Sequence, residues 1–320
     1  MSLQKTIGKT FELEGLCFYS GNPINALFHP ASEDTGILFN TVRGNVKHSL
    51  QNAVPCRRSI LLKDGPAKII NVEHVTSTLK YGYGIDNVYI IVRRMPPKKK
   101  SQYIPYFTHF TDTEVFPNTG DEELTLCRKL DEVGVVEQGK ENIMLTLRQP
   151  FITDKLSFLP IDHGIFMHAT TDYFPIGEQT FEIEMTPENY KKELAGARRY
   201  AEHVKYLNFL PVAIRDRFAS FLTAFANPSY GLGHGFSVDN VFLPVSTEEQ
   251  WKAQEKYDAE IARHTIVDRL GALALIDGRL DGIRCVMKFS NHINDIAVLN
   301  EMDKVLSRKV SAGRKVYKGK

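Results

Sequence analysis

The sequence predicts an α+β protein made of two similar units. Its 320 residues are about twice the length of a domain of average size. In each half, short strands separated by turns lead to a helix, and a further strand follows that helix. We place the boundary near residue 137, so residues 1–137 form an N-terminal α+β domain and residues 138–310 a C-terminal one.

The composition is that of a globular protein without a strongly charged partner. Hydrophobic residues make up 42% of the chain and charged residues 24%, with a formal net charge of +2. This charge is too small to indicate a nucleic-acid partner. No stretch approaches the roughly 18 apolar residues of a membrane span, and residues 1–5 are not followed by the apolar segment of a signal peptide. We therefore expect a cytoplasmic protein with no transmembrane segment and no nucleic-acid partner.

The cysteines and the C-terminus carry little chemistry of their own. The four cysteines are scattered and contain no CxxC pair, which argues against a disulfide framework or a thiolate zinc site. We expect them to be reduced and buried. Residues 311–320 are a basic tail, which we interpret as a frayed end or a weak anchor for anions. The cysteines are Cys17, Cys56, Cys127 and Cys285.

The first half contains several strands and two helices. Apolar residues recur at helical spacing over residues 71–81, where Asn71 is a plausible cap, and again over 121–134, where Gly134 ends the helix. A continuous run of β-favouring residues at 88–92 predicts a buried strand. Earlier strands are expected at residues 10–16, 24–28 and 36–39.

The second half repeats this succession. Thr186 followed by Pro187 is a helix start signal. A later helix buries apolar residues between 261 and 273, and it begins either at the capping-box pattern of residues 247–250 or at Asp258. Apolar residues recur at mixed helical spacing over residues 198–226, where Pro211 interrupts them. Strands are expected at 143–147, 156–160, 164–169, 179–185, 238–244 and 283–289, and a closing helix at 296–306.

Two histidines and one aspartate suggest a metal site. His264 and Asp268 are four residues apart in a predicted helix, so their side chains lie about 5–6 Å apart on one face. This is a suitable spacing for two ligands, although the same spacing also forms surface salt bridges. The apolar neighbours favour a metal site over a surface salt bridge, because burying an unpaired aspartate carboxylate costs free energy. With His74, the pair would complete three corners of a tetrahedral Zn²⁺ site and leave the fourth for water.

Two further residues could carry proton transfers. Glu73 is adjacent to His74, where it could accept a proton from the zinc-activated water. His292 lies among polar residues after a strand and is the remaining candidate to protonate a leaving group. Glu73 could instead serve only to stabilise the first turn of a helix through the helix dipole, and His292 could be a loop histidine hydrogen-bonded to backbone. Together the five residues indicate a metal-dependent hydrolase.

These residues lie in segments that resemble a known family, the zinc-dependent UDP-3-O-acyl-N-acetylglucosamine deacetylases of lipid A biosynthesis. The segments occur in the family's order and spread over most of the chain. The blocks containing Glu73-His74 and His264-x-x-x-Asp268 are the specific ones. The matching segments are Gly15 to Gly21, Asp34 to Phe39, Val72 to Val75, Gly84 to Asn87, Ser237 to Asn240, Arg263 to Gly271, and Ser290 to Asn294.

The resemblance implies both a fold and a set of roles. The fold would be two related α+β domains, each a sheet layer packed on helices, with the active site between them. His74, His264 and Asp268 would bind zinc, Glu73 would act as the general base, and His292 would protonate the departing amine. The substrate would be a nucleotide-linked, acylated N-acetyl amino sugar.

Several positions depart from the family pattern on the substrate side. Thr265 replaces a lysine expected near the substrate phosphates, and Ala272 replaces an aspartate expected to hold the general-acid histidine. Arg199 replaces a residue whose hydroxyl is expected at the reacting carbonyl, and Tyr200 follows it. Compared with the family, residues 203–235 form an enlarged insert. If neither Asp281 nor Asp295 reaches His292, the protonated form of His292 should be less favoured than in the family.

The sequence therefore supports three functional hypotheses. The first is a zinc-dependent deacetylase of a UDP-3-O-acyl-N-acetylglucosamine-like sugar, in which Arg199, Tyr200 and Thr265 face the substrate. The second is a zinc amidase acting on a different N-acyl sugar. The third is a zinc- or ligand-binding protein on the same scaffold without turnover, motivated by the changes at Thr265 and Ala272.

Overall fold

Each half of the chain contributes one five-stranded sheet, and the two sheets have the same topology. The computed structural model describes residues 2–17, 22–56, 59–95, 113–119, 121, 123–173, 176–200, 241–242, 252–253, 255–288 and 292–310. The first sheet has the order β2-β3-β9-β4-β5 and the second β13-β14-β20-β15-β16. In each sheet only the third and fourth strands of this order pair in parallel. The predicted α+β class with two similar units is confirmed.

The strands of these two sheets have the following bounds. In the first sheet they are β2 (Phe11–Leu16), β3 (Pro23–Pro30), β4 (Ile37–Thr41), β5 (Gly44–Lys47) and β9 (Val88–Arg94). In the second they are β13 (Phe151–Ile152), β14 (Leu156–Pro160), β15 (Ile165–Tyr173), β16 (Gly177–Glu184) and β20 (Ile283–Lys288).

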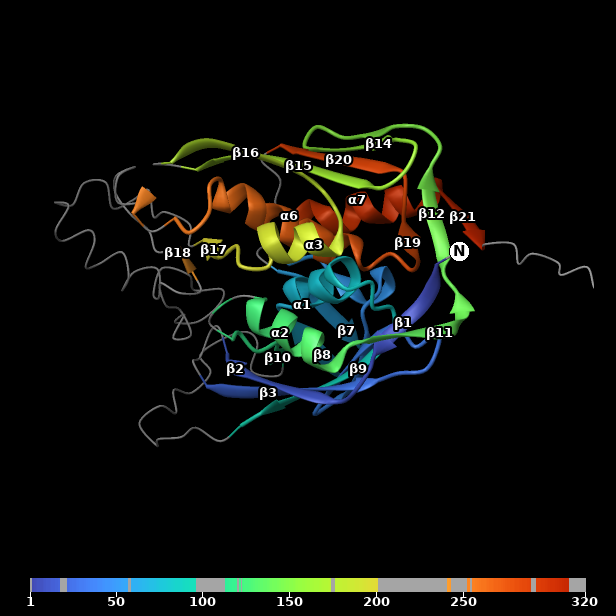
Figure 1. Cartoon of the computed structure of the whole chain (residues 1–320), viewed down its shortest axis with the longest axis vertical. Helices are drawn as coiled ribbons and strands as arrows, with labels where there is room; N and C mark the ends of the chain where they lie inside the picture. Colours follow the sequence, from blue (N-terminus) through green and yellow to red (C-terminus); the bar gives the residue numbers. More distant parts are fainter. Residues whose placement is uncertain are drawn as a thin grey trace, which may run out of the picture.

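The helices lie as a middle layer between the two sheets, as Figure 1 shows. They are α1 (Glu73–Ser77), α2 (Leu124–Val133), α3 (Pro187–Asn189), α6 (Glu260–Leu273) and α7 (His292–Val305). Helix α6 packs on α1 on one side and on β15 and β16 on the other. Because protein surrounds it, α6 is buried at most of its positions rather than along one stripe.

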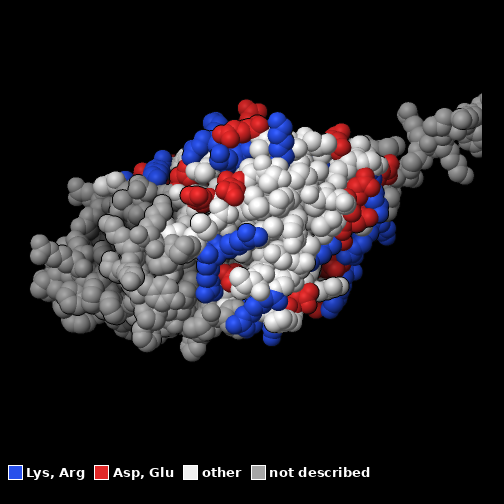
Figure 2. Space-filling view, turned by 90° about the horizontal axis from the view of Figure 1, so that it is seen from below, with Lys and Arg blue, Asp and Glu red and all other residues white. Residues whose placement is uncertain are grey.

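The sheet nearer the bottom of Figure 1 buries alternate residues against this helical layer. In β9, Val88, Ile90 and Val92 are buried, while the residues between them are more exposed. This alternation follows from the two-residue repeat of a pleated strand. Figure 2 views the molecule from that side, and its described surface mixes basic and acidic side chains without a continuous area of one sign.

Smaller elements complete the two halves. A four-stranded sheet has the order β10-β8-β7-β6, a three-stranded one β19-β12-β21, and two pairs join β1 to β11 and β17 to β18. The strands are β1 (Leu3–Ile7), β6 (Ala53–Val54), β7 (Leu61–Asp64), β8 (Ala67–Ile70), β10 (Glu114–Val115), β11 (Val135–Glu141), β12 (Ile143–Leu147), β17 (Arg199–Tyr200), β18 (Val241–Phe242), β19 (Arg279–Leu280) and β21 (Leu306–Val310). The short helices are η1 (Leu50–Asn52), η2 (Thr78–Gly82) and η4 (Tyr190–Leu194), of which η2 and η4 are π-helical.

Two helix signals of the sequence are confirmed. Gly134 ends α2 with a positive φ of 72°, a conformation that glycine adopts readily. The Thr186 hydroxyl accepts a hydrogen bond from the Asn189 backbone N–H at 3.1 Å, and Pro187 occupies the first turn of α3.

Three helix predictions were wrong in detail. Asn71 does not cap the first helix: its φ is 63°, and Val72 is the N-cap residue. The left-handed Asn71 instead turns the chain after β8, and its N–H donates to the Ser59 hydroxyl. The helix near residue 260 starts after Ala259 rather than at Asp258. The closing helix begins four residues early, and β21, which pairs with β12, was not predicted.

Several predictions remain outside what the structure tests. The boundary near residue 137 falls inside β11, which pairs with β1 at the start of the chain. The insert at 203–235 and the basic tail at 311–320 lie outside the described residues, as do residues 247–250. Within the described ranges, no helix has the length and apolar character needed to cross a membrane.

A buried histidine makes the fold sensitive to acid. His48 follows β5 and is 5% exposed, and neither ring nitrogen makes a hydrogen bond of normal geometry to a described residue. Burial, with the nearby Lys80 ammonium, lowers the pKa of His48 to about 3, although the Ala274 carbonyl opposes this shift slightly. His48 is therefore neutral in the folded protein over most of the acidic range.

We predict that His48 destabilises the fold progressively below pH 6.5. The unfolded chain binds a proton near its ordinary pKa while the folded chain does not until about pH 3, so stability is lost as the pH falls between these values. By pH 5 the loss should be about 2 kcal/mol. Denaturant unfolding at pH 7 and pH 5 should show this loss in the parent chain and in the exposed control His163→Leu, and a smaller loss in His48→Leu. An equal loss in all three would contradict the prediction.

Candidate metal centre

The three predicted metal ligands come together in the structure. His74 Nε2 lies 3.0 Å from Asp268 Oδ1, and His264 Nε2 lies 3.3 Å from Asp268 Oδ2. One potential ligand atom from each residue lies within 4.8 Å of the others. The side chains of His74 and His264 are 2% and 5% exposed, and that of Asp268 is 17% exposed. The cluster is therefore largely enclosed but still reachable through its carboxylate.

The two halves of the chain each supply part of this cluster. His74 is the second residue of α1 in the first half. His264 and Asp268 are one turn apart on α6 in the second half, as their spacing predicts. The centre therefore forms only where α1 and α6 meet in the middle layer of Figure 1.

A glycine allows this close meeting of the two helices. A Cβ atom added at Gly271 would lie 2.6 Å from both the backbone carbon and the Cα atom of Glu73, far inside van der Waals contact. The obstructing atoms belong to backbone, so they cannot move aside as a flexible side chain could. Gly271 is thus required for the spacing that places His74 opposite His264 and Asp268.

The donor set fits a zinc ion. The Nε2 atoms of both histidines face one carboxylate, and no described cysteine belongs to the group. The Nδ1 atom of His264 faces the Ala197 carbonyl at 3.2 Å. A proton on Nδ1 would be donated to that carbonyl, leaving Nε2 free to bind a metal. Two imidazole nitrogens and one carboxylate oxygen, with a fourth position open, are typical of catalytic zinc sites.

A buried ion pair holds the carbonyl that orients His264. The Arg198 side chain donates to both oxygens of Glu260, at 2.8 and 3.1 Å, and its backbone N–H donates to Oε1 at 3.0 Å. The Arg198 and Glu260 side chains are 3% and 0% exposed. Because Arg198 directly follows Ala197, this pair fixes the peptide that faces His264. The sequence carried no signal for this contact, which joins residues far apart in the chain.

A second carboxylate lies behind His74. Glu123 Oε1, at the N-cap position of α2, is 3.9 Å from His74 Nδ1, and its side chain is 10% exposed. A carboxylate on the far nitrogen of a ligating histidine is a common means of orienting the ring. Spacing along the sequence could not have identified Glu123, because α2 reaches α1 only through the folding of the first half.

Glu73 is buried and held by its own partners. The Ser59 hydroxyl lies 2.9 and 2.8 Å from its two carboxylate oxygens and can donate to either. The Ile60 backbone N–H donates to Oε2 at 3.3 Å. These contacts fix the orientation of the carboxylate directly beside His74. The role of Glu73 as a base stays a prediction.

The remaining predicted residues are only partly placed. The Thr265 hydroxyl donates to the Ile261 carbonyl of its own helix at 2.9 Å. His292 is the first residue of α7, and Arg199 and Tyr200 form β17, but the side chains of these three are outside the described structure. Ala272, where the family pattern has an aspartate, is fully buried. Asp281, one proposed partner of His292, accepts a hydrogen bond from the Gly164 backbone N–H at 2.8 Å.

Fold and site together define an α+β protein with a His–His–Asp centre at the contact between two repeated halves. The family profile described as UDP-3-O-acyl N-acetylglycosamine deacetylase (LpxC) matches residues 4–103. Curated proteins named UDP-3-O-acyl-N-acetylglucosamine deacetylase match nearly the whole chain. The protein of Wolinella succinogenes is 26% identical over 302 residues, 92% of this chain and 88% of that protein.

Other relatives with the same name give the same result. The Nitratiruptor sp. protein is 25% identical over 309 residues, 94% of this chain and 90% of its own length. The protein of Helicobacter hepaticus is 24% identical over 302 residues, which are 92% of this chain and 88% of that protein. This similarity to proteins named UDP-3-O-acyl-N-acetylglucosamine deacetylase agrees with the resemblance that the motifs indicate.

We predict that Gly271→Ala separates α1 from α6 and weakens the metal centre. The added methyl group meets Glu73 backbone, so the helices must move apart, at a cost of about 1–3 kcal/mol. Zinc titration against a competing chelator should show weaker binding, and thermal unfolding a lower midpoint. Gly139→Ala is the control, since the nearest atom there is the end of the flexible Glu33 side chain, 3.2 Å away. Parent-like zinc affinity in Gly271→Ala would contradict the account of the helix contact.

Proposed function

We propose that this chain is a zinc-dependent hydrolase that removes the N-acetyl group from UDP-3-O-acyl-N-acetylglucosamine, a step of lipid A biosynthesis. The observation that carries the proposal is the convergence of His74 and His264 on the Asp268 carboxylate. The curated relatives that cover nearly the whole chain are named for this deacetylation. Motifs, geometry and relatives therefore support the same chemistry.

His74, His264 and Asp268 would hold the zinc ion. When bound, zinc supplies a Lewis acid that polarises the amide carbonyl and makes water a better nucleophile near neutral pH. The chain contributes the orientation of its ligands. The Ala197 carbonyl, 3.2 Å from Nδ1 of His264, keeps the Nε2 atom of that ring directed inward, and the Glu123 carboxylate lies 3.9 Å from Nδ1 of His74.

Glu73 and His292 would move the protons. Glu73 would take a proton from the attacking water, and the hydrogen bonds from Ser59 and Ile60 hold its carboxylate in place for this. His292 would donate a proton to the departing amine from the N-terminus of α7. The attack then forms a carbon–oxygen bond to the acetyl carbon and breaks its carbon–nitrogen bond, releasing acetate and the free amine.

The substrate side of the site would be formed by Arg199, Tyr200 and Thr265. Arg199 could supply the cationic contact to phosphate that the Thr265 position has lost. Residues 1–137 and 138–310 remain our proposed domains, with residues 203–235 as an insert in the second. We also propose the cytoplasm as the compartment, since the scattered spacing of the four cysteines is not that of a secreted disulfide framework.

One observation favours a second candidate substrate. The Thr265 hydroxyl is engaged with its own helix, so it does not replace the lysine of the family pattern in either charge or direction. A zinc amidase acting on an N-acyl sugar without a nucleotide needs no such cation. The loss of this cation is also compatible with a binding protein that does not turn over substrate. An assay of acetate release distinguishes such a protein from an enzyme.

The proposal is tested by acetate release from UDP-3-O-acyl-N-acetylglucosamine, with zinc content measured on the same samples. The zinc-loaded parent chain should turn over. Glu73→Gln should keep its zinc and lose activity by about 10²–10⁴-fold, because it removes general-base catalysis. His264→Ala should lose both zinc and activity, since a ligand is removed.

The exposed Glu132→Gln on α2 is the matched control and should behave like the parent. Release of acetate from an N-acetyl sugar lacking UDP, but not from the nucleotide sugar, would favour the second candidate. Zinc binding without any acetate release from either substrate would contradict the enzyme assignment. Full activity in Glu73→Gln would remove Glu73 from the mechanism.

A further inference from the structure

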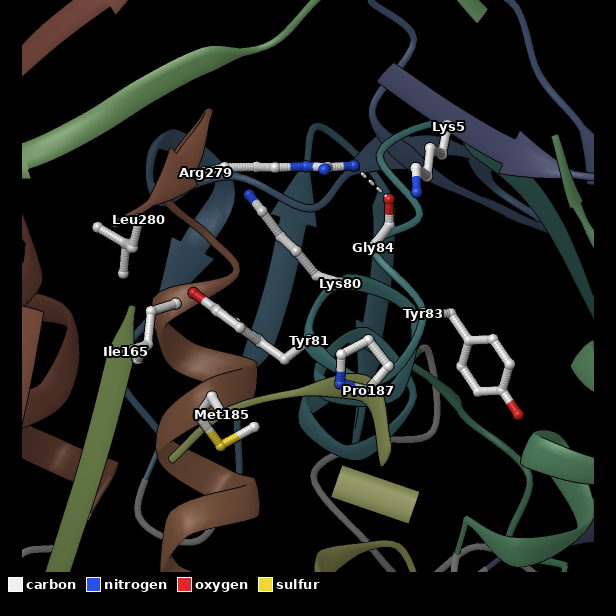
Figure 3. Close-up of a pocket in the computed structure, with 10 residues that line it drawn as sticks. All are labelled: Lys5, Lys80, Tyr81, Tyr83, Gly84, Ile165, Met185, Pro187, Arg279 and Leu280. Carbon is white, nitrogen blue, oxygen red and sulfur yellow. Dashed lines mark hydrogen bonds between the residues drawn. The ribbon is translucent and has the colours of Figure 1, made fainter. Parts of the chain in front are cut away.

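A cavity lies away from the metal centre. Its volume is about 220 Å³, and none of its lining residues is a predicted metal ligand or catalytic residue. Residues of η2 and the turn after it form one side, and residues of β15, β19 and the segment after β16 form the other (Figure 3). The cavity therefore sits where the two halves meet, near the C-terminal end of α6, whereas His264 lies near the start of that helix.

The lining is positively charged at one end. Lys5, Lys80 and Arg279 line the cavity, and no acidic residue is among the lining residues. In Figure 3 the Lys80 ammonium and the Arg279 guanidinium lie together, with Lys5 beyond Gly84. Asp86 binds Arg279 at 2.7 and 3.2 Å, so this guanidinium is fixed in place. Among the described residues no carboxylate forms an ion pair with the Lys80 ammonium, although Asp86 and Asp277 lie near enough to favour its charged form.

Two hydrogen-bonding groups at the cavity are incompletely used. The Lys80 ammonium donates to the carbonyl of Ile276 at 2.8 Å and to that of Ala274 at 3.5 Å, and no other described residue accepts its third proton. The Tyr81 hydroxyl makes no hydrogen bond to any described residue, and Figure 3 shows it directed toward Ile165 and Leu280. Burial lowers the pKa of Lys80 to about 8, which leaves its ammonium mostly charged at neutral pH.

The other end of the cavity is apolar. Ile165, Met185, Pro187 and Leu280 line it, and all four come from the second half of the chain. An anion alone would satisfy the cationic end but leave this wall facing water. A ligand with an anionic group and a short hydrocarbon part would match both ends.

We propose that this cavity binds a small organic carboxylate, with its anionic group against Lys80 and the Tyr81 hydroxyl and its hydrocarbon part against Ile165, Met185 and Leu280. The volume of about 220 Å³ is smaller than that of a drug-sized pocket and suits a ligand of about eight non-hydrogen atoms. Hexanoate has this size and is the probe of choice. A carboxylate would accept the unused donors of both side chains.

The test is a titration of the full chain by saturation-transfer NMR with three probes: hexanoate and hexan-1-ol are observed directly, and inorganic phosphate, which has no C–H proton, is measured by its displacement of hexanoate. Hexanoate should bind saturably with a Kd on the order of 1 mM, as expected for so small a ligand. Hexan-1-ol, which lacks the charge, and inorganic phosphate, which lacks the hydrocarbon, should each bind at least about 10-fold more weakly. Equal binding of hexan-1-ol would mean an apolar pocket only, and equal binding of phosphate an anion site only; either result would overturn the proposal.

Two variants locate the binding. Lys80→Met should weaken hexanoate binding by about 10-fold or more, and Tyr81→Phe, which removes only the hydroxyl oxygen, by about 3- to 10-fold. Lys129→Met, at a half-buried lysine of α2 that does not line the cavity, is the control and should bind like the parent. If Lys80→Met fails to fold, Tyr81→Phe still decides the outcome. Parent-like hexanoate binding in the folded variants would place the ligand elsewhere and overturn the proposal.

Discussion

The contact between α1 and α6 at Gly271 is the constraint on which the rest of the site depends. Each helix carries only part of the metal centre, and the parts meet because no side chain stands between the Gly271 Cα atom and the Glu73 backbone. The same contact sets Glu73 and His74 beside α6. A glycine in the interior of a helix lowers the stability of that helix. Gly271 nevertheless allows α1 and α6, which come from different halves of the chain, to form one site.

The repeated topology explains why the centre lies where it does. Each half presents a five-stranded sheet of the same order, and each sheet needs a helical layer to cover its apolar face. When the two helical layers pack on each other, α1 and α6 become the innermost elements (Figure 1). Polar groups buried between these helical layers need hydrogen-bond partners. Segments that pack against the helices supply the partners of His264, Glu73 and Arg198.

Local sequence patterns predicted the elements that depend on local physics. Runs of β-favouring residues between turn signals predicted most strands of the two main sheets, Gly134 and Thr186 marked helix ends, and the spacing of His264 and Asp268 placed both on one face. The contacts of Ser59 with Glu73, of Ala197 with His264 and of Glu123 with His74 were not predictable. They join segments that only the tertiary fold brings together, so no spacing along the chain reports them. The β21 strand was missed for the same reason, because its partner β12 lies in a distant segment.

X-ray absorption spectroscopy at the zinc edge, on the zinc-loaded full chain, would identify the atoms that bind the metal. We expect a first shell of nitrogen and oxygen atoms only, with the outer-shell scattering of two imidazole rings from His74 and His264. Sulfur in the first shell would contradict it, because none of the proposed ligands is a cysteine. So would the absence of imidazole scattering, since zinc would then be held somewhere other than between α1 and α6.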